Sequence, residues 1–182
     1  SSTQLYSTTT IPILVYHKIS SKNPFFSGNH HLSEAYSVTD EHFRMQMKFL
    51  ADQGYTTLTM RELLVRAASS TLPQKPVAIT FDDGWRSQYE VALPILLHYH
   101  MTATFYIYTD VIGSPLFMTI DQLRALTSVH MEIGGHTKHH SKLSKISPYR
   151  YKEELEDSKK TLEKNLPVQV VDFAYPYGMY NE

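Results

Sequence analysis

The sequence contains no cysteine in its 182 residues. Disulfide bonds and thiolate metal ligands are therefore excluded, and any metal site must be built from histidine, aspartate or glutamate. The sequence also has no apolar run close to the roughly 20 residues that a membrane-spanning helix needs, so we expect no transmembrane segment.

An excess of charge of one sign is also missing. The 17 basic and 18 acidic residues nearly cancel, and the formal net charge is −1. The sequence has no excess of basic residues that would favour binding to nucleic acid, and its near-neutral charge fits a neutral substrate better than a charged one. Hydrophobic residues make up 42% of the chain, which is ordinary for a folded protein. The length predicts a single domain over residues 1–182.

Both ends of the sequence carry an expectation of their own. Residues 1–4 have neither a methionine nor an apolar signal core, which is typical of a processed or artificial start. The sequence stops at Glu182, shortly after a Pro-Tyr-Gly turn and without a closing element. We therefore expect that the C-terminal part of the domain is missing.

Expected strands and helices alternate along the chain. The expected strands are residues 11–16, 55–58, 77–81, 103–108, 131–133 and 170–174. The expected helices start near Asp40, Thr59, Ser87, Thr119 and Ser147. Two of them begin with capping boxes, Thr59/Glu62 and Thr119/Gln122. Pro94 is expected to kink the helix that starts near Ser87 or to delay its start. This alternation predicts an α/β fold with a parallel sheet, either open or closed into a barrel.

Polar residues follow four of the expected strands. His17 follows the first, Asp82 and Asp83 follow the third, His136 follows the fifth, and residues 175–177 follow the last. In parallel α/β folds the carboxyl ends of the strands share one rim, where active sites form. We therefore expect these side chains to meet at one site.

Asp82 and Asp83 are adjacent and precede Gly84. Where a strand breaks at glycine, both carboxylates can turn toward one centre, and their repulsion then calls for a cation or a shared proton. The alternative is an ordinary turn, because Asp-Gly is a common turn dipeptide.

His136 and His140 are spaced i, i+4. On a helical turn they would share a face, as in known zinc motifs, with His139 as a rival second ligand. A solvated surface turn is the alternative. Two imidazoles and one carboxylate leave a fourth position for water, which is the open geometry of catalytic zinc. Cobalt, nickel and iron also accept this ligand set.

The remaining candidates each keep two interpretations. His17 is either a general acid at the rim or a partly buried, hydrogen-bonded histidine. Residues 175–178 are either a simple turn or the source of a backbone N–H for an oxyanion. Four aromatic residues either stack on a sugar or pack in the core: Trp85, Tyr106, Tyr108 and Phe117. The loop 23–36, with Phe25, Phe26, His30 and His31, either overhangs the site or lies on the surface.

Three of these segments resemble, in order, the motifs of a known family. Residues 80–84 read Thr-Phe-Asp-Asp-Gly, residues 135–140 read Gly-His-Thr-Lys-His-His, and residues 173–178 read Phe-Ala-Tyr-Pro-Tyr-Gly. They are similar to the polysaccharide deacetylases, the NodB homology domain. Two segments resemble one branch of this family more closely, the biofilm poly-β-1,6-N-acetylglucosamine deacetylases. They are residues 173–178 in their Phe-Ala-Tyr-Pro-Tyr-Gly form and residues 14–19, which read Leu-Val-Tyr-His-Lys-Ile.

The resemblance implies a fold and an activity. The fold would be a distorted (β/α) barrel with about seven parallel strands. The activity would be the metal-dependent removal of N-acetyl groups from a β-linked N-acetylglucosamine polysaccharide, most directly the β-1,6-linked polymer. A secreted, periplasmic or cell-surface location follows from such a substrate, and so does an association with the envelope.

The resemblance also implies the role of each site residue. Asp83, His136 and His140 would bind one divalent metal, with zinc as the default, and Asp82 would be the general base. In the same way His17 would be the acid, and the backbone of Tyr177 would help to hold the oxyanion. Contacts with the substrate are expected at three further residues, namely Trp85, Arg86 and Tyr175.

Two departures from the family pattern matter. Ala174 stands where many members have an arginine that pairs with the catalytic aspartate, so the charge partner of Asp82 is open and Arg86 is one candidate. The family's further C-terminal motifs, with its usual acid histidine, do not occur in the sequence. Two alternatives therefore remain: deacetylation of chitin oligomers, peptidoglycan or another N-acetylated glycan, and a module that binds glycan or metal without turnover.

Overall fold

A computed structural model describes residues 10–20 and 36–180 of the chain. Five strands form the main sheet: β1 (Ile13–Tyr16), β4 (Thr56–Leu58), β5 (Pro76–Phe81), β6 (Thr104–Ile107) and β7 (Glu132–Gly135). Central β5 pairs with β1 on one side and with β4 and β6 on the other, and β7 pairs with β6. A separate pair joins β2 (Lys18–Ser20) to β3 (Ser37–Thr39), and every pairing in both sheets is parallel.

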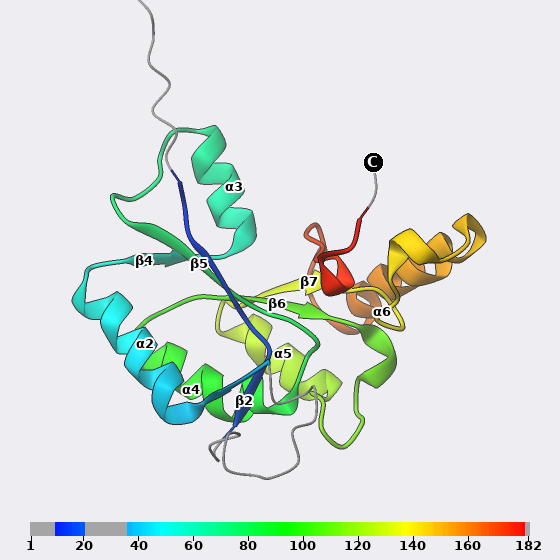
Figure 1. Ribbon diagram of the computed structural model, residues 1–182, viewed down its shortest axis with the longest axis horizontal. Coiled ribbons are helices and arrows are strands. Elements are labelled where there is room, and N and C mark those ends of the chain that lie inside the picture. The colour runs from blue at the N-terminus through cyan, green and yellow to red at the C-terminus, as the bar shows by residue number, and fades with distance from the viewer. Residues whose placement is uncertain (1–9, 21–35, 181–182) are drawn as a thin grey trace, which may run out of the picture.

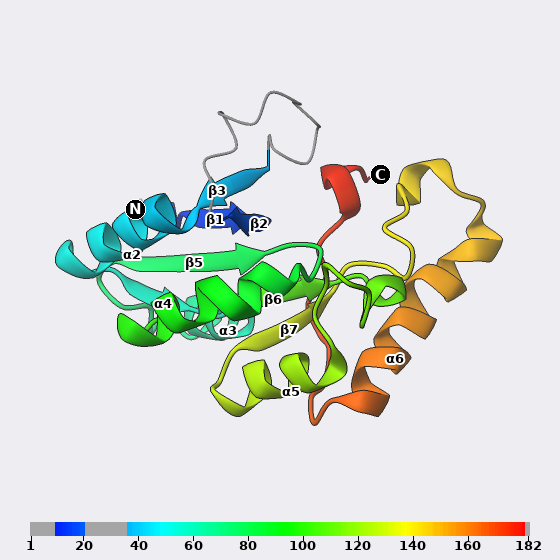
Figure 2. The ribbon, with the colours of Figure 1, turned by 90° about the horizontal axis from the view of Figure 1, so that it is seen from below.

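Helices connect and cover these strands. They are α2 (Asp40–Asp52), α3 (Met60–Ala68), α4 (Leu93–His98), α5 (Ile120–Ser128) and α6 (Ser158–Asn165). Two π-helical segments, Gln88–Ala92 and Lys152–Asp157, lead into α4 and α6. Figure 1 shows α2, α4, α5 and α6 following one another around the outside of the sheet, and Figure 2 shows β1, β2 and β3 on the other side of β5 from α4. The predicted α/β fold is confirmed, with the parallel sheet of a distorted (β/α) barrel.

Local sequence signals placed two helix starts correctly. In the first capping box, Glu62 N–H donates to Thr59 Oγ1 at 3.2 Å while Thr59 N–H donates to Glu62 Oε2 at 3.0 Å. The same reciprocal bonds join Thr119 and Gln122 at 3.3 and 2.9 Å. Both predicted capping boxes are therefore confirmed. They could be predicted because each depends only on residues within one helical turn.

Other local predictions were wrong or incomplete. Thr39, not Asp40, caps α2, since its Oγ1 accepts from His42 N–H at 3.1 Å. Ser147 makes no side-chain capping bond. Pro94 does not delay the helix, because residues 86–98 are continuously helical and the π-helical segment Gln88–Ala92 runs directly into α4.

Pairing between distant segments was harder to predict. Residues 170–174 are not a strand, because only Phe173 forms an isolated bridge, with Gly135. Strands β2 and β3 lie on either side of the expected loop 23–36, where the sequence predicts no strand. Residues 21–35, and with them most of the expected overhanging loop, lie outside the described residues.

Aromatic packing fixes the end of β5. Phe43, Phe81 and Phe105 are fully buried, and the rings of Phe81 and Phe105 stack with centroids 4.7 Å apart. Burying one such side chain stabilises the fold by about 1.5–3 kcal/mol. Since Phe81 directly precedes Asp82, this core packing holds the strand end from which the site begins.

Candidate active site

The two aspartates lie where β5 ends. Asp82 N–H donates to the Tyr16 carbonyl oxygen at 2.9 Å, which places the pair beside the end of β1. Asp83 and Gly84 then adopt left-handed φ angles of 75° and 81°. A β-carbon on Gly84 would lie 3.2 Å from the Ile107 side chain. Glycine and aspartate tolerate this backbone conformation better than most residues, and the resulting turn directs the carboxylates to the rim.

His136 follows β7 and is almost fully buried, with 1% of its surface exposed. Its N–H donates to the Ile107 carbonyl oxygen at 3.0 Å, and its Nδ1 lies 2.8 Å from the Ala174 carbonyl oxygen. A carbonyl oxygen only accepts hydrogen bonds, so Nδ1 carries the proton and Nε2 keeps its lone pair. The ring is therefore oriented to bind a metal through Nε2.

His140 reaches the same place through a loop. Thr137 and His140 have left-handed φ angles of 68° and 58°, so the predicted helical turn over residues 136–140 is wrong. The loop nevertheless brings the rings of His136 and His140 to 4.9 Å between centroids. His139, the rival ligand, instead places Nδ1 3.0 Å from Oε1 of Glu154.

The three expected metal ligands converge on one point. Oδ1 of Asp83 lies 3.2 Å from Nε2 of His140 and 3.6 Å from Nε2 of His136, and the three ligand atoms all lie within 4.8 Å of one another. Within the described residues Oδ1 is buried without a hydrogen-bond partner, whereas Oδ2 accepts from Trp85 Nε1 at 2.9 Å. A buried oxygen left facing two imidazole nitrogens fits a divalent metal with an open coordination position.

The environments of the two aspartates push their pKa values apart. Burial raises the pKa of Asp83, but the close imidazoles of His136 and His140 and the hydrogen bond from Trp85 outweigh burial and hold the pKa well below its usual value. Burial also raises the pKa of Asp82, and there the opposing charges of His136 and His17 do not cancel it. Divergent environments of this kind are typical of carboxylates with different roles, as expected for a metal ligand and a base.

His17 lies between β1 and β2, with Nε2 3.9 Å from Oδ2 of Asp82. One buried amide ties the two segments together, because Gln88 Nε2 donates to the His17 carbonyl oxygen at 2.9 Å and to the Asp82 carbonyl oxygen at 2.6 Å. A cleft of about 280 Å³ is lined by His17, Tyr36, Asp82, His136, His140, Tyr175, Tyr177 and Gly178. The expected acid, base and metal-binding histidines therefore share one cleft.

Two tyrosines border this cleft. Tyr177 has a left-handed φ of 60°, and its ring centroid lies 4.7 Å from that of His140. Lys142 Nζ stands 4.6 Å above the Tyr177 ring, a cation–π contact. Tyr175 and Tyr177 are 47% and 62% exposed, so both rings are accessible to a ligand in the cleft.

Trp85 and Arg86 face other parts of the protein. Besides its bond to Asp83, Trp85 stacks on Phe117 with centroids 4.5 Å apart. Arg86 donates to the carbonyl oxygens of Phe117 and Ser114 at 3.4 and 3.5 Å. No ion pair joins Arg86 to Asp82 within the described part of the chain, so the structure does not supply Arg86 as the charge partner of that aspartate.

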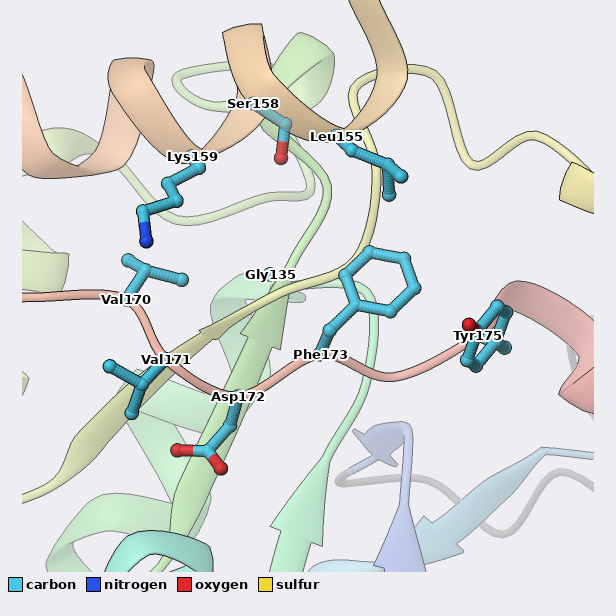
Figure 3. A pocket seen from close by; sticks show the side chains of 9 residues that line it. All are labelled: Gly135, Leu155, Ser158, Lys159, Val170, Val171, Asp172, Phe173 and Tyr175. Carbon is cyan, nitrogen blue, oxygen red and sulfur yellow. The ribbon is translucent and has the colours of Figure 1, made fainter. Parts of the chain in front are cut away.

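A larger hollow of about 350 Å³ lies beside residues 170–173 and is separate from the metal ligands (Figure 3). Leu155, Ser158 and Lys159 project into it from the helical segment above, while Asp172 points away from that segment. None of the three converging ligands lines this hollow. The expected metal ligands therefore belong to the smaller cleft.

Sequence reasoning missed two buried polar residues that support the site. Gln88 and Glu154 are both 0% exposed. Each lies in a π-helical segment, where a polar residue occupies an inward-facing position. A polar side chain that interrupts an apolar helical face is the signal that could have identified them.

This fold, with two histidines facing the aspartate pair, is that of the polysaccharide deacetylase family. The family description "Polysaccharide deacetylase" matches residues 69–182, and the chain belongs to that family. The YxkH protein of Bacillus subtilis is 35% identical over 173 residues, covering 94% of this chain and 58% of the relative. A poly-β-1,6-N-acetyl-D-glucosamine N-deacetylase of Staphylococcus aureus is 31% identical over 189 residues, covering 93% and 65%. The chain thus spans less than two thirds of the length of these curated relatives.

Solved structures agree with the fold. The Streptococcus pyogenes deacetylase PplD, solved in complex with acetate, superposes with a TM-score of 0.86 at 34% identity, covering 96% of this chain and 76% of that one. IcaB from Ammonifex degensii superposes with a TM-score of 0.77 at 24% identity, covering 94% and 76%, and supports the fold alone. No helix in the described part of the chain has both the length and the apolar composition to cross a membrane.

Proposed function

We propose that this chain carries the active site of a metal-dependent polysaccharide N-deacetylase. The observation that carries the proposal is the convergence of Asp83 Oδ1 with Nε2 of His136 and Nε2 of His140. A second carboxylate, Asp82, and a further histidine, His17, line the same cleft. Amide hydrolysis needs this combination: an electrophilic centre, a base for water and an acid for the leaving amine.

Each residue has a separate role in the proposed reaction. Asp83, His136 and His140 would hold a divalent metal, zinc by default with cobalt, nickel or iron as alternatives, and the metal would supply Lewis acidity. Asp82 accepts a proton from water as the water oxygen bonds to the acetyl carbon. His17, as the imidazolium, gives a proton to the sugar nitrogen as the carbon–nitrogen bond breaks, which releases acetate and an amine.

Tyr177 stabilises the negative charge that develops on the acetyl oxygen in the proposed reaction. Its left-handed conformation after Pro176 places it on the cleft wall beside His140. We propose that its backbone N–H donates to the oxygen of the acetyl group as that oxygen becomes negative. One such donor is worth about 10²–10³ in rate in other acyl-transfer enzymes.

The proposed substrate is poly-β-1,6-N-acetylglucosamine. Support comes from the Staphylococcus aureus relative that bears this substrate in its name, and from the placement of His17 at the end of β1 beside Asp82. The exposed rings of Tyr175 and Tyr177 would contact the sugar. A substrate of this kind also implies that the protein acts outside the cell or at its surface, in keeping with a role in biofilm.

Acetate release separates this proposal from its rivals. The parent protein should release acetate from β-1,6-linked N-acetylglucosamine oligomers faster than from β-1,4-linked ones or from peptidoglycan fragments. A preference for another glycan would keep the deacetylase chemistry and overturn the substrate. Metal and glycan binding without acetate release from any of them would show a binding module instead.

Asp82→Asn tests the role of the base. The variant should lose acetate release by at least about 100-fold, the lower range for a general base, and should keep metal binding, because Asp82 is not a ligand. Asp121→Asn is the control, since the Asp121 side chain is 89% exposed on α5 and pairs with Arg124. Full activity in Asp82→Asn would rule out this aspartate as the base.

A further inference from the structure

Glu154 is a fully buried carboxylate that lies outside the metal-ligand group. Its Oε2 accepts from the backbone N–H groups of Lys138 and His139 at 3.1 and 3.0 Å. Its Oε1 accepts from Ser141 Oγ at 2.7 Å, His139 Nδ1 at 3.0 Å and Arg150 Nη2 at 3.1 Å. Nearly all of these donors belong to the loop that follows β7.

The bonds to Glu154 lie on both sides of His140. His139 precedes this metal ligand, and Ser141 follows it. Within the described part of the chain, the polar contact of the His140 ring is the one with Asp83 Oδ1, and the rings of Tyr108, His136 and Tyr177 pack against it. No carbonyl oxygen orients its second nitrogen as Ala174 orients that of His136. The position of His140 therefore depends on these ring contacts and on the conformation of its loop.

That loop conformation is costly on its own. Thr137 and His140 both have left-handed φ angles, and a non-glycine residue held there is strained unless its surroundings compensate. Four bonds to one carboxylate could compensate: one each from Lys138 and Ser141, and two from His139. Hydrogen bonds to an ionised acceptor are also stronger than neutral ones.

The chain positions Glu154 for this contact. It lies in the π-helical segment Lys152–Asp157, and such segments occur frequently at functional sites. Its neighbours Glu153 and Glu156 have side chains 41% and 57% exposed, so the inward direction is specific to Glu154. Burial alone would raise the pKa of Glu154, but hydrogen bonds from His139 and Ser141 outweigh it and lower the pKa, which keeps the carboxylate charged.

We propose that Glu154 is a positioning residue of the metal site, which holds residues 138–141 so that Nε2 of His140 meets Asp83. The inference rests on the proposed function, since it presumes that Asp83, His136 and His140 bind a metal. Among the described residues, no hydrogen bond or ion pair joins Glu154 to these three ligands. It acts on the site through the backbone and side chains that flank His140.

Zinc affinity of Glu154→Gln tests the proposal. The glutamine keeps the size of the side chain but loses its charge, and its amide group faces N–H donors. Zn²⁺ binding, measured by competition with a chromophoric chelator, should weaken by about 10–100-fold. This is the usual effect of mutating a residue that holds a metal ligand in place without binding the metal itself. The visible spectrum of the Co²⁺-loaded variant should also change, because His140 moves relative to the ion. Circular dichroism of the metal-free variant checks its fold.

Glu156→Gln is the matched control, because it removes the same charge from the exposed side of the same segment, where Glu156 binds Lys160. Its zinc affinity should stay within about twofold of the parent. Ser141→Ala is a milder second variant that removes the 2.7 Å bond and keeps the carboxylate. It should weaken zinc binding by about tenfold, at the lower end of the range for outer contacts.

The outcomes separate the inference from the proposed function. If the parent itself binds no zinc, the proposed function fails. If the parent binds zinc and a folded Glu154→Gln binds it within about twofold of the parent with an unchanged Co²⁺ spectrum, the positioning role is overturned. If Glu154→Gln does not fold, Ser141→Ala decides, and parental zinc affinity in that variant overturns the role.

Discussion

The Nδ1 atom of His136 lies 2.8 Å from the backbone carbonyl oxygen of Ala174. This contact fixes the ring so that Nε2 faces Oδ1 of Asp83 at 3.6 Å. Ala174 stands where the family pattern often has an arginine, yet it serves the site through its backbone. A segment that is not a strand thereby orients the proposed metal ligand that directly follows β7.

His136→Asn tests this orientation. The asparagine amide can still donate to the Ala174 carbonyl oxygen from the position of Nδ1, but it has no atom at the position of Nε2. We expect zinc affinity to fall by more than about 100-fold, beyond the range for outer contacts, while the fold is kept. His130→Asn is the control, because His130 has a left-handed φ of 64° that asparagine tolerates and lies at the opposite end of β7. Unchanged zinc affinity in His136→Asn would exclude Nε2 as a ligand.

His17→Gln tests the proposed acid. Glutamine keeps a polar side chain near Asp82 but cannot deliver a proton to the leaving amine. The rate constant for acetate release should fall by about 10²–10⁴-fold, with zinc affinity as in the parent, because His17 is not among the converging ligands. Steady-state acetate assays and zinc titration on the same preparation measure both quantities. A variant that turns over at the parental rate would mean that the proton comes from another group.

Asp172 should make the stability of the protein depend on pH. Burial, together with a hydrogen bond and the charge of Glu132, raises its pKa to about 7. In the unfolded chain the pKa is about 3.9, so the folded state binds more protons between these two values. The free energy of unfolding should therefore fall as pH rises from about 4 through about 7.

Asp172→Asn should remove much of this dependence. The neutral amide imitates the protonated acid, so the variant should be at least as stable as the parent at pH 8 and should show a smaller drop in Tm between pH 5 and pH 8. The side chain points away from the helical segment in Figure 3, so that packing should be unaffected. Asp52→Asn, on the exposed end of α2, should change the Tm profile little. An equal Tm drop in the parent and in Asp172→Asn would contradict the assignment.

Sequence reasoning succeeded where a feature depends on neighbours along the chain. Thr59/Glu62 and Thr119/Gln122 form their capping boxes within single turns, so their positions follow from spacing alone. The meeting of Asp83 with His136 and His140 was also expected, because the carboxyl ends of parallel strands share one rim. The motifs at residues 80–84 and 135–140 indicated which side chains at this rim were the candidate ligands.

Features that depend on tertiary contacts could not be predicted. Residues 170–174 have the composition of a strand, but in the structure only Phe173 bridges to Gly135. The spacing of His136 and His140 suggested a helical turn, whereas left-handed residues in a loop hold them. Glu154 is one acid among several in the helix expected after Ser147, and its burial against the loop at Ser141 is visible only in the structure.

The metal content of the protein tests the central claim most directly. After equilibration with Zn²⁺ and removal of excess ion, elemental analysis of the parent and of Asp82→Asn should find about one zinc per chain, the occupancy of a single three-ligand site. His140→Ala should retain far less, with circular dichroism showing that it remains folded. A parent that retains no zinc, or a His140→Ala that binds it as fully and as tightly as the parent, would contradict the account.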